Sequence, residues 1–103
     1  MTAIDVTAEN LEQVLQSEKT ILIDFGWCPP CTAMKPVIDS LAEELNSDAL
    51  IGTLDVDANQ HAPAKYGVRN LPTFMIFKNG TLRDRIVGAV PKLLLQQKPK
   101  ALT

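Results

Sequence analysis

The sequence is poor in the residues that bind metal ions or build disulfide frameworks. Its 103 residues include only two cysteines and one histidine. A structural zinc site takes four ligands, usually cysteine and histidine, so these residues argue against zinc, and we expect no metal and no other bound cofactor. Two cysteines allow at most one bridge within the chain, which excludes the disulfide-dense class of small domains.

Excess positive charge and long apolar runs are also missing. The formal net charge is −2, which provides no field that would attract nucleic acid or an anionic membrane. No apolar run approaches the length of a membrane span, and the N-terminus lacks the basic stretch, apolar core and cleavage site of a secretory signal. We therefore expect a cytoplasmic protein that binds neither nucleic acid nor membranes.

Length and composition indicate one globular domain over residues 1–103. Hydrophobic residues make up 46% of the chain and charged residues 21%, which are ordinary values for a folded domain. A chain of this size can bury a modest core and is too short for two. We expect it to be a monomer.

The two cysteines lie in one short run, Cys28-Pro29-Pro30-Cys31. One helical turn separates them, so their sulfurs can form and break a disulfide with little backbone movement. A bridge that closes so short a loop removes little unfolded-state entropy, which favours redox chemistry over a structural role. Haem attachment is excluded because Thr32, rather than histidine, follows Cys31. Half of a zinc site and a pair of inert buried thiols remain as alternatives.

Hydrophobic patterning predicts strands and helices that alternate along most of the chain. The expected strands are 3–6, 20–25, 49–56, 73–77 and 81–87, and the expected helices follow Thr7, run from Cys31 to Leu45, and span 59–66 and 91–97. Pro36 should kink the second helix, Gly67 should close the third, and Pro99 should end the last. Asn79-Gly80 predicts a tight hairpin turn.

This order, βαβαβαββα, predicts an α/β fold. Strands that are linked by helices pair in parallel, whereas the closing hairpin adds antiparallel pairs. We therefore expect a central mixed β-sheet with helices on both faces.

Five motifs, in this order and spacing, resemble the thioredoxin family. They are Ile23-Asp24-Phe25, Trp27-Cys28-Pro29-Pro30-Cys31, Pro36, the run Val68-Arg69-Asn70-Leu71-Pro72-Thr73-Phe74, and Lys78-Asn79-Gly80. The resemblance extends from about Ala3 to Pro91 and implies the thioredoxin fold. It also implies reduction of disulfide-containing protein substrates by dithiol–disulfide exchange, with a thioredoxin reductase restoring the dithiol.

The resemblance assigns catalytic roles to four residues. Cys28 matches the exposed nucleophile, whose thiolate is favoured at a helix N-terminus, and Cys31 matches the resolving cysteine. Asp24 matches a buried aspartate that moves a proton to or from the resolving thiol; burial would raise its pKa. The alternative is a strand-end aspartate that faces solvent. Pro72 matches a cis-proline beside the cysteines.

The resemblance also implies a substrate-binding surface around the nucleophile. Leu71 would present its backbone to a substrate strand. An apolar patch would surround the nucleophile, and the expected substrate-binding residues are Trp27, Pro29, Pro30, Leu71, Val87 and Gly88. Judged by hydrophobicity alone, Leu71 and Val87 would belong to the core. His61 and Met75 match no role and are expected at the surface and in the core.

The chain departs from the family pattern at three places. Only Gly26 and Trp27 separate Phe25 from the first cysteine, where the family usually has four residues. Pro29-Pro30 replaces the usual Gly-Pro, which removes an N–H donor from the first turn and also resembles the longer proteins tryparedoxin and nucleoredoxin. Thr53 stands where a lysine often neighbours the buried aspartate. These departures leave two alternatives: a binding or chaperone module that acts without redox chemistry, and a more oxidising disulfide oxidoreductase.

Overall fold

The structure is a computed structural model that describes residues 3–26, 32–45 and 48–102. The described residues form, in order, β1 (Ile4–Val6), α1 (Leu11–Leu15), β2 (Thr20–Phe25), α3 (Lys35–Glu44), β3 (Ala49–Leu54), α4 (His61–Tyr66), β4 (Thr73–Lys78), β5 (Thr81–Val87) and α5 (Lys92–Leu102). The predicted order βαβαβαββα is confirmed. Trp27, Pro29, Pro30 and both cysteines lie outside the described residues.

The strands form one mixed sheet in the order β1-β3-β2-β4-β5. β3 pairs in parallel with β1 and β2, whereas β4 pairs antiparallel with β2 and β5. β2 lies at the centre, and all of its residues are buried. This explains why its sequence is almost continuously apolar, as a strand covered on both faces requires.

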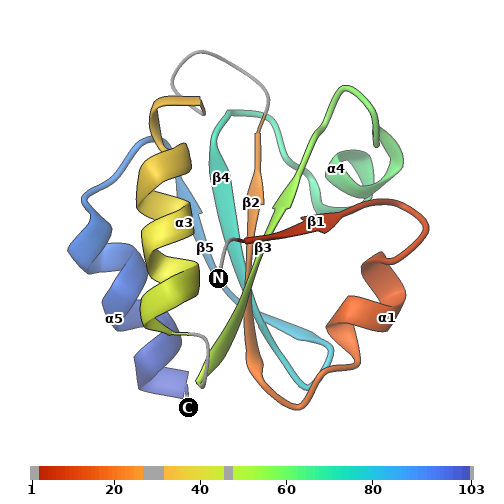
Figure 1. Cartoon of the computed structure of the whole chain (residues 1–103). Helices are drawn as coiled ribbons and strands as arrows, with labels where there is room; N and C mark the ends of the chain where they lie inside the picture. The colour runs from red at the N-terminus through yellow and green to blue at the C-terminus, as the bar shows by residue number, and fades with distance from the viewer. Residues whose placement is uncertain (1–2, 27–31, 46–47, 103) are drawn as a thin grey trace.

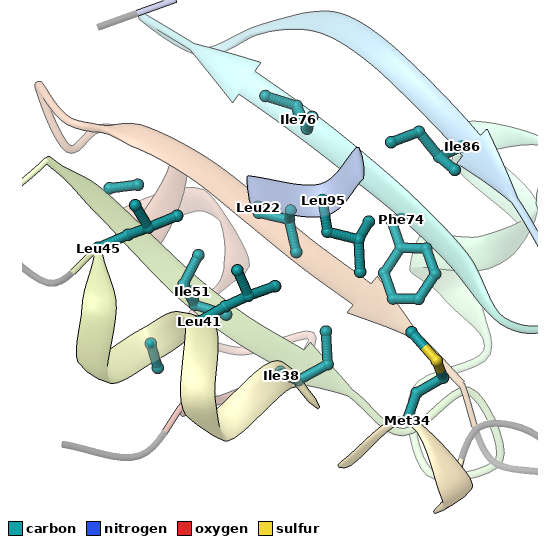
Figure 2. Close-up of a cluster of buried hydrophobic side chains, with 12 residues drawn as sticks. Leu22, Met34, Ile38, Leu41, Leu45, Ile51, Phe74, Ile76, Ile86 and Leu95 are labelled. Carbon is teal, nitrogen blue, oxygen red and sulfur yellow. The ribbon is translucent and has the colours of Figure 1, made fainter. Parts of the chain in front are cut away.

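Helices cover both faces of the sheet, as expected. α3 and α5 lie on one face, and α1 and α4 lie on the other (Figure 1). Successive side chains of a strand point to opposite faces, so Leu22 contributes to the core beneath α3 and α5, while Ile21 and Ile23 belong to the opposite core. Figure 2 shows the first core, in which Leu95 of α5 lies beside Leu22 and Phe74.

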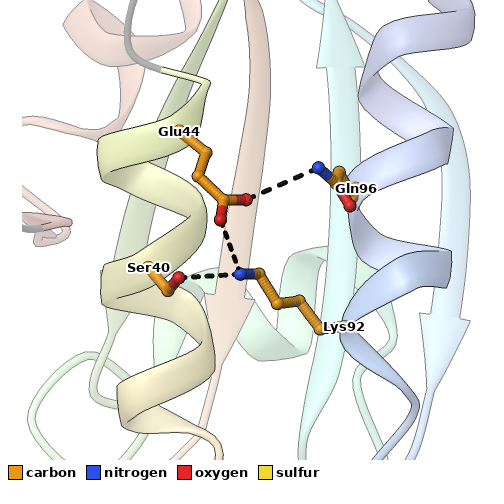
Figure 3. Close-up of polar contacts among 4 residues, drawn as sticks. All are labelled: Ser40, Glu44, Lys92 and Gln96. Carbon is orange, nitrogen blue, oxygen red and sulfur yellow. Dashed lines mark hydrogen bonds and ion pairs between the residues drawn. The ribbon is translucent and has the colours of Figure 1, made fainter.

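Polar contacts hold α5 against α3 at the edge of this core. The Lys92 ammonium donates to the Ser40 hydroxyl at 2.8 Å and to Glu44 Oε1 at 2.7 Å, and the Gln96 amide donates to Glu44 Oε2 at 3.5 Å (Figure 3). Lys92 and Glu44 are both partly exposed, so their ion pair stabilises the fold by about 1 kcal/mol at most. Leu95, which is fully buried in the core beneath both helices, adds apolar contacts to this attachment.

One expectation about proline is confirmed and a second was wrong. Thr32 and Ala33 are helical, Met34 is a turn residue, and α3 begins at Lys35, so the helical segment is interrupted just before Pro36, as predicted. Pro36 lies in the first turn of α3, where its missing N–H would have no helical partner. Pro99 does not end the last helix, which continues to Leu102. Pro99 is buried, so its packing offsets the hydrogen bond that it cannot donate to the preceding turn.

The two turn predictions that rest on left-handed backbone are confirmed. Asn79 and Gly80 both have positive φ, 54° and 77°, as a tight turn between β4 and β5 requires. Gly67 closes α4 with φ of 67°. In the part of the chain that the structure describes, no helix is long and apolar enough to cross a bilayer.

Candidate functional site

Asp24 is a carboxylic acid on the central strand β2, one residue before that strand ends. It is 6% exposed, and it lies on the face of β2 that α3 covers, because Leu22 two residues earlier packs there. Across the sheet it pairs with Thr53 of β3 and Phe74 of β4, which offer no positive charge. Its Oδ1 atom is buried and finds no hydrogen-bond partner among the described residues. The predicted burial of Asp24 is confirmed, and the solvent-facing alternative is wrong.

Burial changes the chemistry of this acid. Desolvation raises the pKa of Asp24 from 3.8 to about 7, because the charged form loses its contact with water. A carboxyl group with this pKa exchanges a proton readily near neutral pH, as a general acid or base must. Perturbed pKa values of this kind gather at functional sites.

A cavity of about 330 Å³ connects Asp24 to the surface. Its lining includes Asp24, Thr53, Gly26, Thr32 and Lys35. Gly26 follows β2 and is held by an N–H···O bond of 3.1 Å to the Leu54 carbonyl. Gly26 and Thr32 are the described residues that flank residues 27–31, so the cavity is lined by a neighbour on each side of that part of the sequence.

The segments around Pro72 and Val87 meet at the same end of the sheet. Thr73 at the start of β4 pairs with Phe25 at the end of β2 and with Val87 at the end of β5. The Gly88 N–H donates to the Pro72 carbonyl at 2.8 Å, which joins the two segments directly. The Leu71–Pro72 peptide bond is cis, as the resemblance implies.

Exposure separates these residues from the core. Val87 is 51% exposed and Leu71 is half-buried, whereas Pro72 is buried. The assignment of Leu71 and Val87 to the core on hydrophobicity alone is therefore wrong, and the resemblance placed them correctly near the surface. His61 is exposed and Met75 is fully buried, as expected.

The arrangement thus gathers one group of predicted residues at one end of the sheet. Asp24, Leu71, Pro72, Val87 and Gly88 lie there, around the strand end that leads into residues 27–31. Within the described segments, no group of three or more histidine, cysteine or acidic residues is arranged to hold a metal ion.

Comparison with known proteins agrees with this architecture. The family model described as Thioredoxin matches residues 2–101, which is nearly the whole chain. The chain belongs to the thioredoxin family.

Individual relatives resemble this thioredoxin-family chain over most of its length. A thioredoxin of Chlorobaculum thiosulfatiphilum is 39% identical over 97 residues, covering 91% of this chain and 90% of the relative. A thioredoxin of Synechocystis is 42% identical over 86 residues, covering 82% and 80%. The solved structure of a mutant thioredoxin from Halobacterium salinarum NRC-1 superimposes with a TM-score of 0.89 at 32% identity, covering 97% of this chain and 89% of that one.

The charged residues around the Asp24 cavity were not predicted from the sequence. Asp5 of β1, Asp55 after β3 and Lys35 of α3 all border it. Lys35 follows Cys31 by four residues, a spacing that puts two side chains on one face of a helix, so the sequence held a usable signal. Asp5 and Asp55 carried no comparable signal, because only the pairing of β1, β3 and β2 brings them near Asp24.

Proposed function

We propose that this protein reduces protein disulfides by dithiol–disulfide exchange through Cys28 and Cys31. Membership of the thioredoxin family supports a thiol–disulfide oxidoreductase. The observation that carries the finer proposal is the cavity beside the buried Asp24. Gly26 and Thr32, which flank the cysteine-bearing residues 27–31 in the sequence, both line this cavity.

The proposed reaction has two exchange steps. The Cys28 thiolate attacks one sulfur of the substrate disulfide, forms a mixed disulfide and releases the first substrate thiolate. Cys31 then loses its proton to the ionised Asp24 carboxylate and attacks the Cys28 sulfur, which releases the second substrate thiolate. Two electrons pass from the dithiol to the substrate, leaving a Cys28–Cys31 disulfide, and the released thiolates take up protons.

Substrates would dock around Val87 and the loop before β4. We propose that the Leu71 backbone pairs with an extended substrate segment, a mode in which main-chain hydrogen bonds supply affinity. The exposed Val87 and the neighbouring Gly88 lie next to Pro72 and would contribute apolar contact. Trp27, Pro29 and Pro30 complete the proposed surface.

Further features of the proposal come from the family and the sequence. A thioredoxin reductase would restore the dithiol, and disulfide-containing proteins would be the substrates. We propose that residues 1–103 act as a single-domain monomer in the cytoplasm, with neither nucleic acid nor a membrane as partner, and without a cofactor or metal.

Reduction of insulin tests the activity and the recycling partner together. The protein should accelerate insulin reduction by dithiothreitol, and it should do so with NADPH and a thioredoxin reductase as the only source of electrons. Activity with dithiothreitol but not with NADPH and the reductase would argue against a thioredoxin reductase as the recycling partner. No acceleration in either assay would contradict the proposed reaction and favour the binding-module alternative.

Docking at Val87 can be tested separately from chemistry. Val87→Asp should raise the KM for insulin several-fold, because a carboxylate in a docked apolar contact costs about 1–2 kcal/mol, while kcat stays close to that of the wild type. The variant should fold normally, since Val87 is 51% exposed. Leu93→Asp is the matched control, because Leu93 is 60% exposed on α5 and outside the proposed docking surface. Equal KM values for the two variants would remove Val87 from this surface.

A further inference from the structure

Lys35 is the one basic residue among the described residues that line the Asp24 cavity. This lysine comes from the first turn of α3, not from the sheet. Across the strands, the row that contains Asp24 runs through Asp5 of β1, Thr53 of β3, Phe74 of β4 and Ile86 of β5. The other members of this row are therefore one acid, one hydroxyl and two apolar side chains, with no cation among them.

Ionisation of Asp24 makes the charge balance of this cavity unfavourable. Asp5 and Asp55 also border the cavity, so the ionised form of Asp24 would be the third carboxylate beside it. Asp24 Oδ1 has no hydrogen-bond partner among the described residues to stabilise that charge. A nearby cation would stabilise the ionised form of a buried carboxylate strongly, because the attraction between opposite charges is stronger where water is excluded.

The present partner of Lys35 holds it only weakly. Its ammonium lies 3.5 Å from Asp39 Oδ2 on the next turn of α3, and the lysine side chain is 69% exposed. Exposed ion pairs of this spacing contribute little, so the flexible lysine chain can leave at small cost. Asp39 keeps a second contact, because its Oδ1 accepts an N–H bond of 3.4 Å from Ala3.

We propose that Lys35 is a positioning residue for the proposed exchange reaction. When Asp24 loses its proton, the Lys35 ammonium turns from Asp39 into the mouth of the cavity and stabilises the carboxylate. Lys35 thereby sets the pH range in which Asp24 can accept the proton of the resolving thiol. The inference rests on the proposed function, since it assumes that Asp24 serves the exchange.

Titration of the Asp24 carboxyl carbon by NMR tests this inference without an activity assay. The full-length protein is used in its oxidised form, so that no thiol titrates in the same range, and Asp24→Asn identifies the signal. Lys35→Met should raise the Asp24 pKa by about 0.5 to 1 relative to the wild type, whereas Lys35→Arg should leave it nearly unchanged. Lys98→Met is the matched control, because it removes the same charge from a lysine paired with Asp84 on β5.

A second variant should shift the Asp24 pKa in the opposite direction. Asp39→Asn frees Lys35 and removes a competing charge, so it should lower the Asp24 pKa, and this decrease should shrink when Lys35→Met is also present. In reduced protein, the pH at which insulin reduction is half-maximal should move in the same direction as the Asp24 pKa. Because the Lys35–Asp39 ion pair is partly exposed and contributes little, denaturant melts at a pH below 4 should show similar stability for the variants and the wild type.

The outcomes separate this inference from the proposed function. An Asp24 pKa that Lys35→Met changes no more than Lys98→Met would overturn the role of Lys35 and leave the exchange reaction standing. An Asp24 carboxyl that titrates near 4 in the wild type would overturn the proposed proton transfer itself, and with it the role of Lys35.

Discussion

Cys28→Ser is expected to abolish insulin reduction, with a loss of roughly three orders of magnitude or more, because the nucleophile is gone. Cys31→Ser should also stop turnover, but for a different reason. Its Cys28 can still attack a substrate, and no second thiol is left to resolve the mixed disulfide. The Cys31→Ser protein should therefore accumulate covalently attached substrate that reductant releases, which mass spectrometry of the trapped species detects.

The order of reactivity provides an independent check on these roles. In the reduced wild type, brief treatment with substoichiometric iodoacetamide should alkylate Cys28 before Cys31, because a helix N-terminus favours the thiolate of the first cysteine. Peptide mapping by mass spectrometry identifies the labelled residue. Preferential labelling of Cys31 would reverse the assignment, and retained biological function in a protein lacking both cysteines would favour a module that acts without redox chemistry.

Asp24→Asn is expected to stabilise the protein at pH 7, although most buried substitutions destabilise. The Asp24 pKa is raised from 3.8 to about 7 in the folded state. Below the unfolded pKa the group is protonated in both states and has no effect. As pH rises, the unfolded state ionises first, so Asp24 becomes a destabilising group whose cost is complete above the folded pKa.

The size of this effect follows from the two pKa values. The difference between 3.8 and about 7 corresponds to about 4 kcal/mol of free energy of unfolding that appears as pH rises through this range. The buried amide of asparagine costs about 1–3 kcal/mol, so the net gain at pH 7 is smaller. The stability difference between Asp24→Asn and the wild type should nevertheless increase steadily from pH 4 to pH 7. The same substitution should slow disulfide exchange, because the proton acceptor for Cys31 is lost.

Denaturant melts between pH 4 and pH 8, together with insulin-reduction rates, measure both halves of this prediction. Asp84→Asn is a control of opposite sign, because its hydrogen bond to Lys98 lowers the pKa of Asp84. Asp84 therefore contributes stability above its unfolded pKa, and that contribution disappears as pH falls through the folded pKa. An Asp24→Asn protein that is less stable at pH 7 and equally active would mean that Asp24 is a structural acid.

Short-range features of the sequence determined most of the framework. Asn79-Gly80 supplies the two left-handed residues of a hairpin turn, Gly67 supplies the left-handed helix end, and both were predicted because these preferences reside in one or two residues. The almost unbroken apolar run of β2 indicated a strand buried on both faces and so favoured a buried acid within it, with a solvent-facing aspartate at the strand end as the alternative. The spacing of the two cysteines and the order of the motifs were sufficient to suggest the family.

Only the tertiary structure decided how these parts come together. Pairing of Phe25 with Thr73, and of Thr73 with Val87, brings strand ends that are far apart in the sequence to one edge of the sheet. Val87 is exposed there although its hydrophobicity suggested the core, and Pro99 lies within a helix although its ring cannot donate a hydrogen bond. The packing of distant segments likewise brings Lys35, Asp5 and Asp55 to the border of the Asp24 cavity. Burial and charge balance depend on which elements pack against one another, and contacts between distant segments carry that information, whereas local residue preferences do not.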